Sequence, residues 1–523
     1  MRTRRIVLAG LLVLISLTLW DRPAVPSLAG TAGRPVCDRA QFAQADALKG
    51  PVSFHGLPPV ELGADLDWRM DPHRNRSWML SLHALRWMGR LIVEYERTGD
   101  GAYLERAKRI TRDWVEDNPR GGSGTSEWAW AEHAVALRAP TLVCLSEHVR
   151  DGWLAESMAE HARVLSDPSL YRAGHNHGLD QDIALLSLGC RLDVAGWRDL
   201  ALRRMTSSAE LAIDGQGALA EQAPRYGVYV HQRLGVAFTA ARRCGLALPA
   251  GLRARRTALE TYIAHATRPD GRLVPLGDSP ADLRPTGFPR PSSPVGVFTG
   301  GYVFGRGGWG PKAAYYSIRF GPGRRLHGHE DHLGLTYRAG GQDVLVEAGF
   351  HSYEKSPYVA WTATPEAHNV PLVEGERFRP GTATRLVRSR IQPVRQAYEL
   401  TDDAFGVSRT RKVLVHHGPD AMAVLDSAGG GRRIRTVWHL APGAQLTLVQ
   451  FEMPGCVPAA PPARKVERIS TGYLKTAEST TLTSPPARSL LTVIVPGRAR
   501  VTCDGAKIRV GANLTIPADL DVG

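Results

Sequence analysis

Histidines and acids are concentrated in one short stretch, RRLHGHEDHLGL, which covers Arg324–Leu335. Six consecutive residues there include His327, His329, His332 and two acidic side chains. On an extended strand, His327, His329 and Asp331 would share one face, because side chains alternate along a strand. Asp331 could then orient one imidazole. The stretch is a candidate for a catalytic or metal site, with a solvated polar edge as the alternative, and we expect His332 to be a surface residue.

Two polar motifs precede this stretch in the chain. AGHNHGLDQ places Asn176 and His177 just before a helical segment, and asparagine is a favourable helix N-cap. Beyond capping, an amide beside an imidazole can hold a carboxylate and accept a proton. In EQAPRY, the side chains of Glu221, Gln222 and Tyr226 lie near a turn into a helix. The tyrosine is either a reactive phenol or a core anchor whose hydroxyl is satisfied.

Ligands of the kind that zinc prefers are distributed around the same stretch. VLVEAGFHSY supplies Glu347 and TPEAHNVPLVEG supplies His368, and with His329 they make two imidazoles and a carboxylate. A strict two-residue turn at Gly340–Gly341 would place Glu347 on the sheet face opposite His329. A bulge, or a position of His329 before the strand, removes this conflict. The prediction is a structural zinc site, and the alternative is a metal-free polar cluster.

Two regions of different periodicity must position these residues. From about Asp71 to Ala266, apolar residues recur at helical spacing, and short Gly, Pro, Asp and Asn connections separate the segments. Paired helices without intervening strands predict an α/α array that curves or closes on itself. After the Pro-, Gly- and Ser-rich segment Arg268–Gly296, short alternating runs rich in β-branched residues predict antiparallel strands in a sandwich.

The net charge of +14 at pH 7, carried mostly by arginine, favours a polyanionic partner. Acidic polysaccharide, nucleic acid and an anionic membrane surface all fit that charge. The sequence contains no lysine- or arginine-rich run, zinc-finger spacing or RNA-binding signature, so we expect no nucleic acid partner. The ordinary hydrophobic content of 43% excludes disorder on a large scale.

The N-terminus has the pattern of a secretory signal. Arg2, Arg4 and Arg5 precede an apolar run that is shorter than the roughly 20 residues a membrane-spanning helix needs. Ser27–Ala29 offers small residues for cleavage, so residues 1–29 are predicted to be a signal peptide, with an uncleaved anchor as the alternative. We therefore expect a secreted or cell-envelope protein with no stable membrane partner beyond this segment.

The six cysteines are spread through the chain, and none lies in a Cys-x-x-Cys pair, so neither a thiolate metal site nor a redox motif is indicated. Export would permit disulfides. Cys456 and Cys503 fall in the same strand-rich region and could pair. For Cys144, Cys190 and Cys244, buried free thiols are an equal alternative.

Taken in order, the motifs resemble those of the heparinase II/III-like polysaccharide lyases, a family that also includes alginate lyases. The strongest match is LHGHEDHLGLTYRAGGQDVLVEAGFHSY followed by EAHNVPLVEG. In the N-terminal half, DPHRNRSWMLSLHALRW, EWAWAEHAVALRA, HNHGLDQ and EQAPRY have similar counterparts, so the resemblance covers about Asp71–Gly375. Three positions depart from the family pattern: Glu347 replaces the usual Asp, Gly227 a frequent His, and Ala223 the usual Ser.

The resemblance implies an α+β chain in two parts, an incomplete (α/α) toroid over residues 38–285 and an antiparallel β-sandwich over residues 296–523. It implies a lyase that cleaves an acidic, uronate-containing polysaccharide by β-elimination and leaves an unsaturated uronate end. No organic cofactor is implied. Carried to the matching positions, it assigns catalysis to Asn176, His177, Tyr226 and His327, substrate binding to Arg74, Glu221, Gln222 and Arg225, and a structural Zn²⁺ to His329, Glu347 and His368.

In that reaction, Asn176 and His327 would donate N–H groups to the uronate carboxylate, which makes the neighbouring C–H acidic enough to lose its proton. His177 suits the base, since an unperturbed imidazole has a pKa of about 6.5. Tyr226 suits the acid that protonates the departing oxygen, or it serves as base and acid in turn.

Two other functions remain open at this point. A glycoside hydrolase on a helical toroid would need two carboxylic acids beside one glycosidic bond, about 5–10 Å apart. A non-catalytic carbohydrate-binding envelope protein is the second alternative, and the joint presence of the four candidate catalytic residues speaks against it. Candidates for the hydrolase pair are Glu127, Glu132, Asp180 and Asp182.

Overall fold

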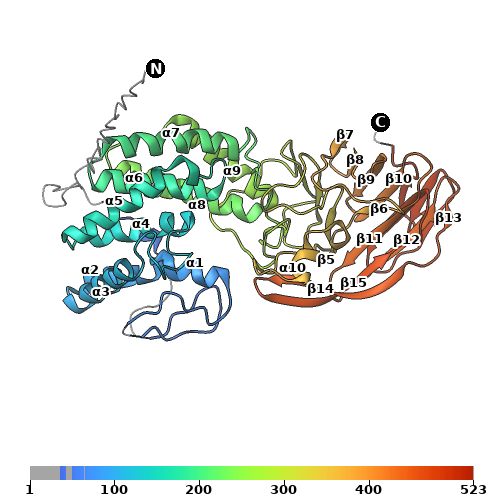
Figure 1. The fold of residues 1–523 in the computed structure, drawn as a ribbon. Coiled ribbons are helices and arrows are strands. Elements are labelled where there is room, and N and C mark those ends of the chain that lie inside the picture. The colour runs from blue at the N-terminus through green and yellow to red at the C-terminus, as the bar shows by residue number, and fades with distance from the viewer. Residues whose placement is uncertain (1–35, 43–49, 64, 522–523) are drawn as a thin grey trace, which may run out of the picture.

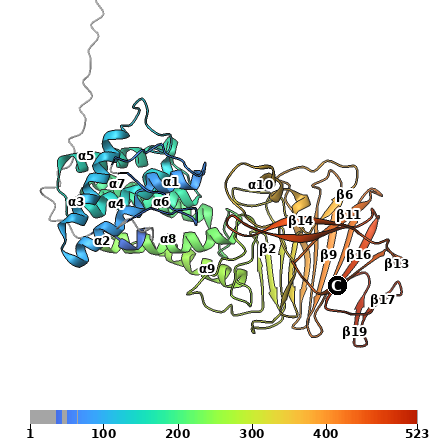
Figure 2. The ribbon, with the colours of Figure 1, turned by 90° about the horizontal axis from the view of Figure 1, so that it is seen from below.

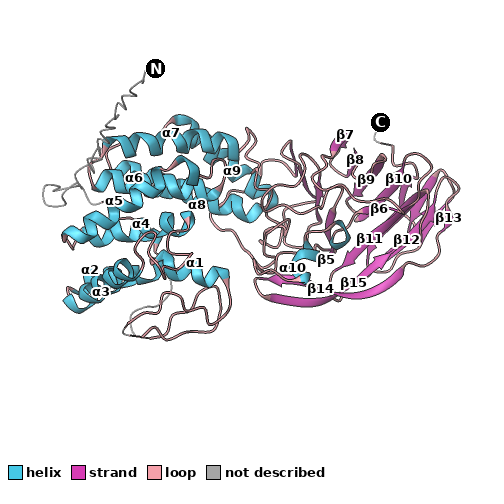
Figure 3. Cartoon of the chain, in the orientation of Figure 1, coloured by secondary structure: helices cyan, strands magenta, loops and turns pink. Residues whose placement is uncertain are grey.

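The computed structural model describes residues 36–42, 50–63 and 65–521 of the 523-residue chain. Its first part is helical and its second part consists of antiparallel sheets (Figure 1, Figure 3), which is the predicted α-then-β order. The predicted signal peptide, residues 1–29, lies outside the described residues. Within the described ranges, no helix is long and apolar enough to cross a bilayer.

Helices occupy the region for which helical spacing was found. Their ends follow local chemistry: Asn75 caps the first helix by accepting a hydrogen bond from the backbone N of Trp78 at 3.1 Å, and Gly99 ends the second with φ 73°. The bounds are α1 (Arg76–Ala84), α2 (Gly89–Thr98), α3 (Gly101–Asp117), α4 (Glu132–Ser146), α5 (Gly152–Ser166), α6 (Asn176–Arg191), α7 (Ala195–Ala212), α8 (Pro224–Arg243) and α9 (Ala250–Ala266).

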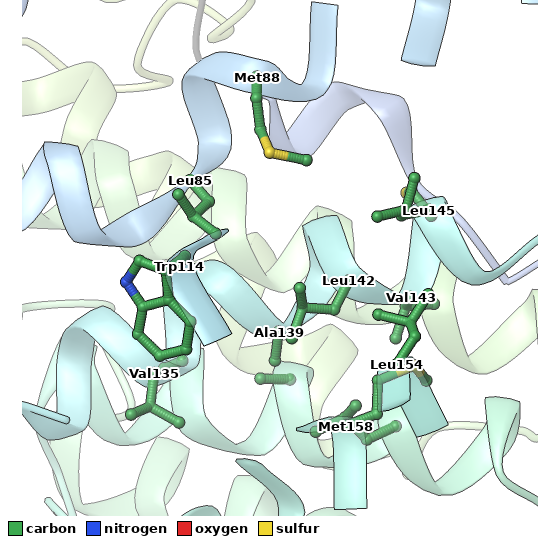
Figure 4. Close-up of a cluster of buried hydrophobic side chains, with 14 of the residues drawn as sticks. Leu85, Met88, Trp114, Val135, Ala139, Leu142, Val143, Leu145, Leu154 and Met158 are labelled. Atoms are coloured by element: carbon green, nitrogen blue, oxygen red, sulfur yellow. The ribbon is translucent and has the colours of Figure 1, made fainter. Parts of the chain in front are cut away.

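Helices α4 and α6 form the centre of the helical part. Every residue of α4 from Ala134 to Ser146 is buried, and a helix that is buried on all sides must be enclosed by others. Figure 4 shows Leu142 of α4 among Met88, Trp114 and Leu154, which come from other segments of the same hydrophobic cluster. Helix α6 packs against α4, α5, α7 and α8, so the start of α6 has a firm position.

Disulfides cross-link distant parts of the described chain. Cys456 and Cys503, which the sequence allowed to pair, are bonded to each other. The alternative of free thiols at Cys144, Cys190 and Cys244 is wrong, because helix packing brings each of them to a partner far away in the sequence. Cys144 is bonded to Cys37, 107 residues away in the sequence, and Cys190 is bonded to Cys244, 54 residues away.

Antiparallel strands build the second part of the chain (Figure 2). Their bounds are β1 (Val295–Phe298), β2 (Tyr302–Arg306), β3 (Tyr315–Arg319), β4 (Leu335–Ala339), β5 (Gln342–Leu345), β6 (Pro371–Val373), β7 (Arg385–Ile391), β8 (Arg395–Asp402), β9 (Arg409–His416), β10 (Ala421–Ala428), β11 (Ile434–Leu440), β12 (Leu446–Glu452), β13 (Val457–Pro458), β14 (Ala463–Gly472), β15 (Lys475–Thr483), β16 (Ser489–Pro496), β17 (Val501–Cys503), β18 (Lys507–Val510) and β19 (Leu514–Pro517).

Two large sheets face each other in this part. One has the strand order β1-β2-β3-β4-β5-β11-β15-β14, with β6 also paired to β11, and the other has the order β13-β12-β16-β10-β9-β8-β7. Strands β17, β18 and β19 form a smaller sheet. Side chains of both large sheets, such as Tyr316 and Val424, share one hydrophobic core. This is the arrangement of a β-sandwich.

Helix α9 joins the helical part to the sheets. It packs against β1 and β2, and the ring centroid of Tyr262 lies 5.3 Å from those of both Phe298 and Tyr302. Figure 2 shows α9 at the side of the helical part that faces the strands. Because this contact is apolar and buried, it fixes how side chains from the two parts can meet.

The hairpin predicted at Gly340–Gly341 is confirmed. These two glycines connect β4 to β5 with φ values of 61° and 78°, which glycine adopts without strain. The register shifts between Tyr337 and Arg338, so the strand pair contains an irregularity of the kind that was expected to relieve the conflict at Glu347.

The histidine-rich stretch before β4 is not extended. The backbone N of Gly328 donates to the carbonyl of Arg325 at 2.8 Å, and the backbone N of Gly334 donates to the carbonyl of Asp331 at 2.8 Å. The prediction that alternate residues of this stretch share one strand face is therefore wrong. Turns, including positive φ values at Leu326 (43°) and Leu333 (66°), direct its side chains to different neighbours.

Candidate active site

Tyr226 lies in the first turn of α8, where the helical part meets the sheets. Pro224 begins this helix, a position at which proline lacks only an N–H that would be unpaired anyway. The Tyr226 ring is stacked on the ring of His327, with centroids 3.7 Å apart and planes 11° apart. Its hydroxyl is hydrogen-bonded to the hydroxyl of Tyr353, and the Arg225 guanidinium lies 5.3 Å from its ring. Tyr226 is thus a buried side chain that contacts residues of both parts, and its hydroxyl is satisfied by Tyr353.

His327 has carboxylates opposite both ring nitrogens. Its Nδ1 is 2.8 Å from Oδ2 of Asp278, and its Nε2 is 3.5 Å from Oε2 of Glu221. The backbone N of His327 also donates to the carbonyl of Glu221 at 3.1 Å. Nε2 has no hydrogen-bond partner within the described protein. The ring is therefore fixed through Nδ1, while the buried Nε2 faces the Glu221 carboxylate without forming a hydrogen bond.

Asp278 was not predicted as a site residue. It lies in the segment between α9 and β1, and it holds His329 as well, with Oδ1 at 3.2 Å from Nε2. Its backbone N donates to the carbonyl of His327 at 2.9 Å. In the sequence, Asp278 is only one polar residue in a Gly- and Pro-rich segment. No helical or strand periodicity marks it as the carboxylate that bonds to both His327 and His329.

Asn176 and Glu221 are buried beside His327 and are hydrogen-bonded to each other. The N-cap of α6 is His175, whose Nδ1 accepts from the backbone N of His177 at 3.0 Å, so the prediction of Asn176 as the cap is wrong by one residue. The backbone N of Asn176 donates to Oε1 of Glu221 at 3.0 Å, and its side-chain amide donates to Oε2. Burial raises the pKa of Glu221 to about 7, against the lowering effect of His327.

His177 is half-buried beside the same helix start. Its ring stacks on that of His133 with centroids 3.7 Å apart, and its Nδ1 is 3.2 Å from Oε1 of Glu132. Burial lowers the pKa of the His177 imidazole below its ordinary value of 6.5, although the bond to Glu132 acts in the opposite direction. A neutral imidazole of this kind can accept a proton.

His175 is a site residue that the motif contained but the prediction left out. Its ring centroid lies 4.4 Å from that of His177 and 5.9 Å from that of His327. Ligand atoms of His175, Glu221 and His327 all lie within 4.8 Å of one another, a spacing that could hold a metal ion. The same spacing can surround a carboxylate. The His-Asn-His triplet was the signal that could have included it.

Three predicted zinc ligands lie in one neighbourhood. Glu347 follows β5, and its Oε2 is hydrogen-bonded to Nδ1 of His368, whose ring centroid is 5.4 Å from that of His329. The buried atoms Oε1 of Glu347 and Nε2 of His368 have no hydrogen-bond partner in the described protein, which suits a metal. Nε2 of His329, however, faces Asp278. The described sets whose ligand atoms lie within 4.8 Å of one another do not include this trio.

Gln222 is buried and holds the loop that carries His327. Its side-chain Nε2 donates to the carbonyls of Pro322 at 3.1 Å and Gly323 at 3.0 Å, and its Oε1 accepts from the backbone N of Arg325 at 2.7 Å. Like Glu221, Gln222 therefore holds the loop that carries His327 in place. Its polar side-chain atoms are already bonded within the protein.

The remaining predicted residues lie further out. Arg74 is exposed in the loop before α1. Asp331 is bound to Arg319, with both carboxylate oxygens 3.2 Å from Nε, and no hydrogen bond to an imidazole is among those described for it. The prediction of His332 as a surface residue is wrong: it is 5% exposed, because the carbonyl of Thr382 covers it at 3.0 Å from Nδ1.

Two of the four carboxylates considered for a hydrolase pair, Asp180 and Asp182, are buried and engaged by other side chains. Asp180 is fully buried and bonded to His133 at 2.9 Å and Tyr229 at 2.6 Å. Asp182 is also fully buried and accepts from the hydroxyl of Tyr171 at 2.8 Å. Neither can face a glycosidic bond, which a hydrolytic acid must do.

Two family models match most of the chain. The Heparinase II/III N-terminus model matches residues 35–282, and the Heparinase II/III-like C-terminal model matches residues 308–513. The chain belongs to the heparinase II/III-like family. The resemblance inferred from its motifs is thereby confirmed, and the site residues of both parts fall within the two matched ranges.

Curated relatives of this heparinase II/III-like protein match over shorter regions. A heparin-sulfate lyase of Bacteroides thetaiotaomicron is 25% identical over 171 residues, which is 29% of this chain and 24% of the relative. A heparin-sulfate lyase of Pedobacter heparinus is 27% identical over 110 residues, 21% of this chain and 16% of the relative. The aligned region thus spans a quarter or less of the length of these relatives.

Solved structures share the fold over nearly the whole chain. The crystal structure of heparinase III has a TM-score of 0.73 and 16% identity, covering 87% of this chain and 86% of that chain. A heparan sulfate lyase mutant from Pedobacter heparinus has a TM-score of 0.67 and 16% identity, covering 89% and 87%. At this identity the likeness establishes the fold: a helical toroid followed by an antiparallel β-sandwich, as predicted.

Proposed function

We propose that this heparinase II/III-like protein is a secreted polysaccharide lyase that cleaves an acidic, uronate-containing polysaccharide by β-elimination. The observation that carries the proposal is the stacking of Tyr226 from the helical part on His327 from the sheet part, with centroids 3.7 Å apart. A phenol, an imidazole and the amide of Asn176 meet there. The curated relatives, both heparin-sulfate lyases, support a glycosaminoglycan as the first substrate to test.

The proposed reaction moves one proton away from the sugar and one onto it. A base takes the proton from the carbon that bears the uronate carboxylate, and the released electron pair forms a double bond to the next ring carbon. The bond from that carbon to the glycosidic oxygen breaks, and an acid protonates the departing oxygen. The products are an unsaturated uronate end and a new reducing end, with no water consumed.

The uronate carboxylate would bind between His327 and Asn176. Nε2 of His327 has no hydrogen-bond partner in the described protein, and the bond from Nδ1 to Asp278 would hold the ring in place for an N–H contact to the carboxylate. Because burial raises the pKa of Glu221 to about 7, this neighbouring side chain is partly neutral near neutral pH and repels an incoming carboxylate less. Donors aimed at the carboxylate stabilise the charge that develops on it during proton loss.

Resting protonation states favour His177 as the base and Tyr226 as the acid. The pKa of His177 is lowered by burial, so its imidazole is neutral near neutral pH. Burial raises the pKa of Tyr226 to about 12, so its phenol carries a proton that it can donate. The hydroxyl of Tyr353 lies beside the oxygen that becomes a phenolate. Use of Tyr226 as base and acid in turn would first require its deprotonation against this pKa.

Arginines around the cluster would bind the neighbouring anionic groups of the polymer. Arg225 lies beside Tyr226, and Arg324 and Arg325 are exposed next to His327. Arg74, which is exposed before α1, would extend this cationic surface. A guanidinium binds carboxylate or sulfate through two parallel hydrogen bonds, which suits recognition of a charged sugar.

A zinc ion would be held by His329, Glu347 and His368; the buried, unpartnered Oε1 of Glu347 and Nε2 of His368 support such a site, whereas Nε2 of His329 faces Asp278. When bound, it would supply a fixed positive charge that organises these side chains. Asp278, which bonds to both His329 and His327, would link that site to the substrate-binding ring.

Export is supported by the cysteines. Every cysteine of the described chain is in a disulfide, and such bonds persist in oxidising compartments outside the cytosol. This agrees with the signal peptide predicted at residues 1–29.

A panel of uronate polymers tests the proposal. Heparan sulfate, heparin, chondroitin sulfate, hyaluronan and alginate would each be incubated with the protein, and the ultraviolet absorbance of the new conjugated double bond would be followed. We expect absorbance from at least one polymer, and loss of at least about a hundredfold in rate with Tyr226→Phe or His177→Ala. Full activity of both variants would refute the assignment of base and acid, and no absorbance from any polymer would refute the lyase.

A further inference from the structure

A groove outside the active site lies between the short helix α10 (Pro357–Thr362) and the β14–β15 strand pair. Its volume is about 380 Å³, which lies within the range of about 300–1,000 Å³ typical of small-molecule sites. None of its lining residues belongs to the cluster around Tyr226. The groove is lined by Tyr358, Trp361, Lys465, Val466, Glu467, Arg468 and Glu478.

One wall of the groove is aromatic. Tyr358 and Trp361 come from the same turn of α10, with ring centroids 6.0 Å apart and planes 27° apart. Both side chains are half-buried, so each keeps part of its surface open. The Tyr358 hydroxyl is buried and has no hydrogen-bond partner in the described protein. Such a wall offers flat apolar faces together with a polar group that a ligand could satisfy.

The opposite wall is charged. Arg468 and Glu478 are directly opposite each other in the register of β14 and β15, and the Arg468 guanidinium lies 5.4 Å from the ring of Tyr358. Lys465 is 75% exposed and pairs with Glu467 at 2.7 Å, while the other oxygen of Glu467 accepts from Thr481 at 2.6 Å. Glu467 is thus engaged within the protein, whereas Arg468 and Glu478 face the groove, and the Lys465 ammonium, although paired with Glu467, is exposed enough to contact a ligand as well.

This combination selects a class of ligand. A purely apolar ligand would leave the charged groups without partners, which is costly. A nucleic acid would meet two carboxylates in the same groove as two cations. A sugar ring has apolar C–H faces that lie well on aromatic rings, and its hydroxyls both donate and accept hydrogen bonds. A uronate or sulfate on that ring would pair with Arg468 and Lys465, whereas Glu478 would accept from hydroxyls.

We propose that this groove is a second saccharide-binding site, which holds a sugar unit of an acidic polysaccharide away from the bond that is cleaved. The choice of an acidic polymer rests on the proposed function; the existence of a sugar site rests on the groove itself. A chain bound at both sites gains affinity, because the second contact forms at the high effective concentration set by the first. Short oligosaccharides that cannot reach both sites would not bind more tightly because of the groove.

The test uses binding and does not require activity. The full protein, its Trp361→Ala and Arg468→Gln variants, and the control Arg464→Gln would be measured on immobilised heparan sulfate chains and on uncharged dextran. Arg464 is exposed on the same strand β14 but does not line the groove. We expect the dissociation constant for heparan sulfate to rise at least about fivefold in the two groove variants, as for aromatic and arginine anchors, and to stay within about twofold in the control.

Several results would overturn the inference. Unchanged affinity in both groove variants would do so, and so would an equal loss in Arg464→Gln, which would indicate general charge attraction. A parent protein that binds dextran as well as heparan sulfate, or binds neither, would also contradict it. Because Arg468→Gln changes an exposed residue, it reports on the site even if Trp361→Ala fails to fold. If the parent binds heparan sulfate through the groove but cleaves no polymer, the proposed function fails and this inference stands.

Discussion

Replacing Tyr353 by phenylalanine tests the pair of phenols where the two parts of the molecule meet. The hydroxyls of Tyr226 and Tyr353 are hydrogen-bonded, and Tyr226 is only 7% exposed. When Tyr226 gives its proton to the departing oxygen, its own oxygen becomes a buried phenolate. The Tyr353 hydroxyl is then the adjacent donor, so its loss should slow the chemical step more than it weakens substrate binding.

The expected loss of rate in Tyr353→Phe follows from the negative charge that forms on the Tyr226 oxygen. A hydrogen bond to a charged group contributes about 1.5–3 kcal/mol, and each 1.36 kcal/mol in the barrier is a factor of about ten in rate. Tyr353→Phe should therefore lower kcat by about 10- to 150-fold. KM should change by less than about twofold, since the interaction strengthens only in the transition state.

Steady-state kinetics on the best polymer of the panel would measure both quantities. In a Tyr226→Phe background, Tyr353→Phe should have no further effect, because the partner oxygen is already absent. Tyr473→Phe is a matched control, since that hydroxyl also bridges the two parts by donating to Ser77 at 3.3 Å. A Tyr353→Phe variant with parental kcat, or one that slows the Tyr226→Phe protein further, would refute the reasoning.

Three other changes are expected to have measurable effects. Asp278→Asn should lower kcat at least about tenfold because the carboxylate fixes His327 at 2.8 Å, and unchanged kinetics in a folded variant would contradict this. Raising the pKa of Glu221 from 4.5 to about 7 makes unfolding free energy fall as pH rises, by about 2–3 kcal/mol between about pH 5 and about pH 8. Urea unfolding should show a flatter pH dependence in Glu221→Gln, and an identical slope would refute the linkage. Replacing Cys37 and Cys144 together by serine opens a 107-residue loop and should cost about 4–5 kcal/mol in the same assay; a loss below about 1 kcal/mol would be inconsistent.

The order of elements could be predicted because burial imposes a period on the sequence. Apolar residues between Asp71 and Ala266 recur at helical spacing, and the short runs after residue 295 are rich in β-branched residues and bounded by turns, so each pattern points to one structure. The turn at Gly340–Gly341 could be predicted just as directly, because both positions need a positive φ, which glycine adopts readily. These features are local, and a single segment contains enough information to specify them.

The site could be predicted only where a motif carried it. Tyr226 and His327 were identified by their motifs, and the structure stacks them. Asp278 and Tyr353 lie in irregular segments with no periodicity, and their importance comes only from contacts made after folding. The burial of His332 likewise depends on a loop some fifty residues later in the chain, so its local sequence suggested an exposed residue.

The pairs Cys37–Cys144 and Cys190–Cys244 could not be predicted for a related reason. Cys37 and Cys144 are 107 residues apart, and only the packing of an N-terminal segment on α4 brings them together. Without that packing, a buried cysteine in a helix is indistinguishable from a small hydrophobic residue.

The ratio of double bonds to new reducing ends tests the central claim most directly. Heparan sulfate, or whichever polymer of the panel is degraded, would be digested while ultraviolet absorbance and reducing ends are measured on the same samples. Elimination predicts one unsaturated uronate for every new reducing end, and both signals should disappear together in Tyr226→Phe. Reducing ends that appear without absorbance would mean hydrolysis and would contradict the proposed function.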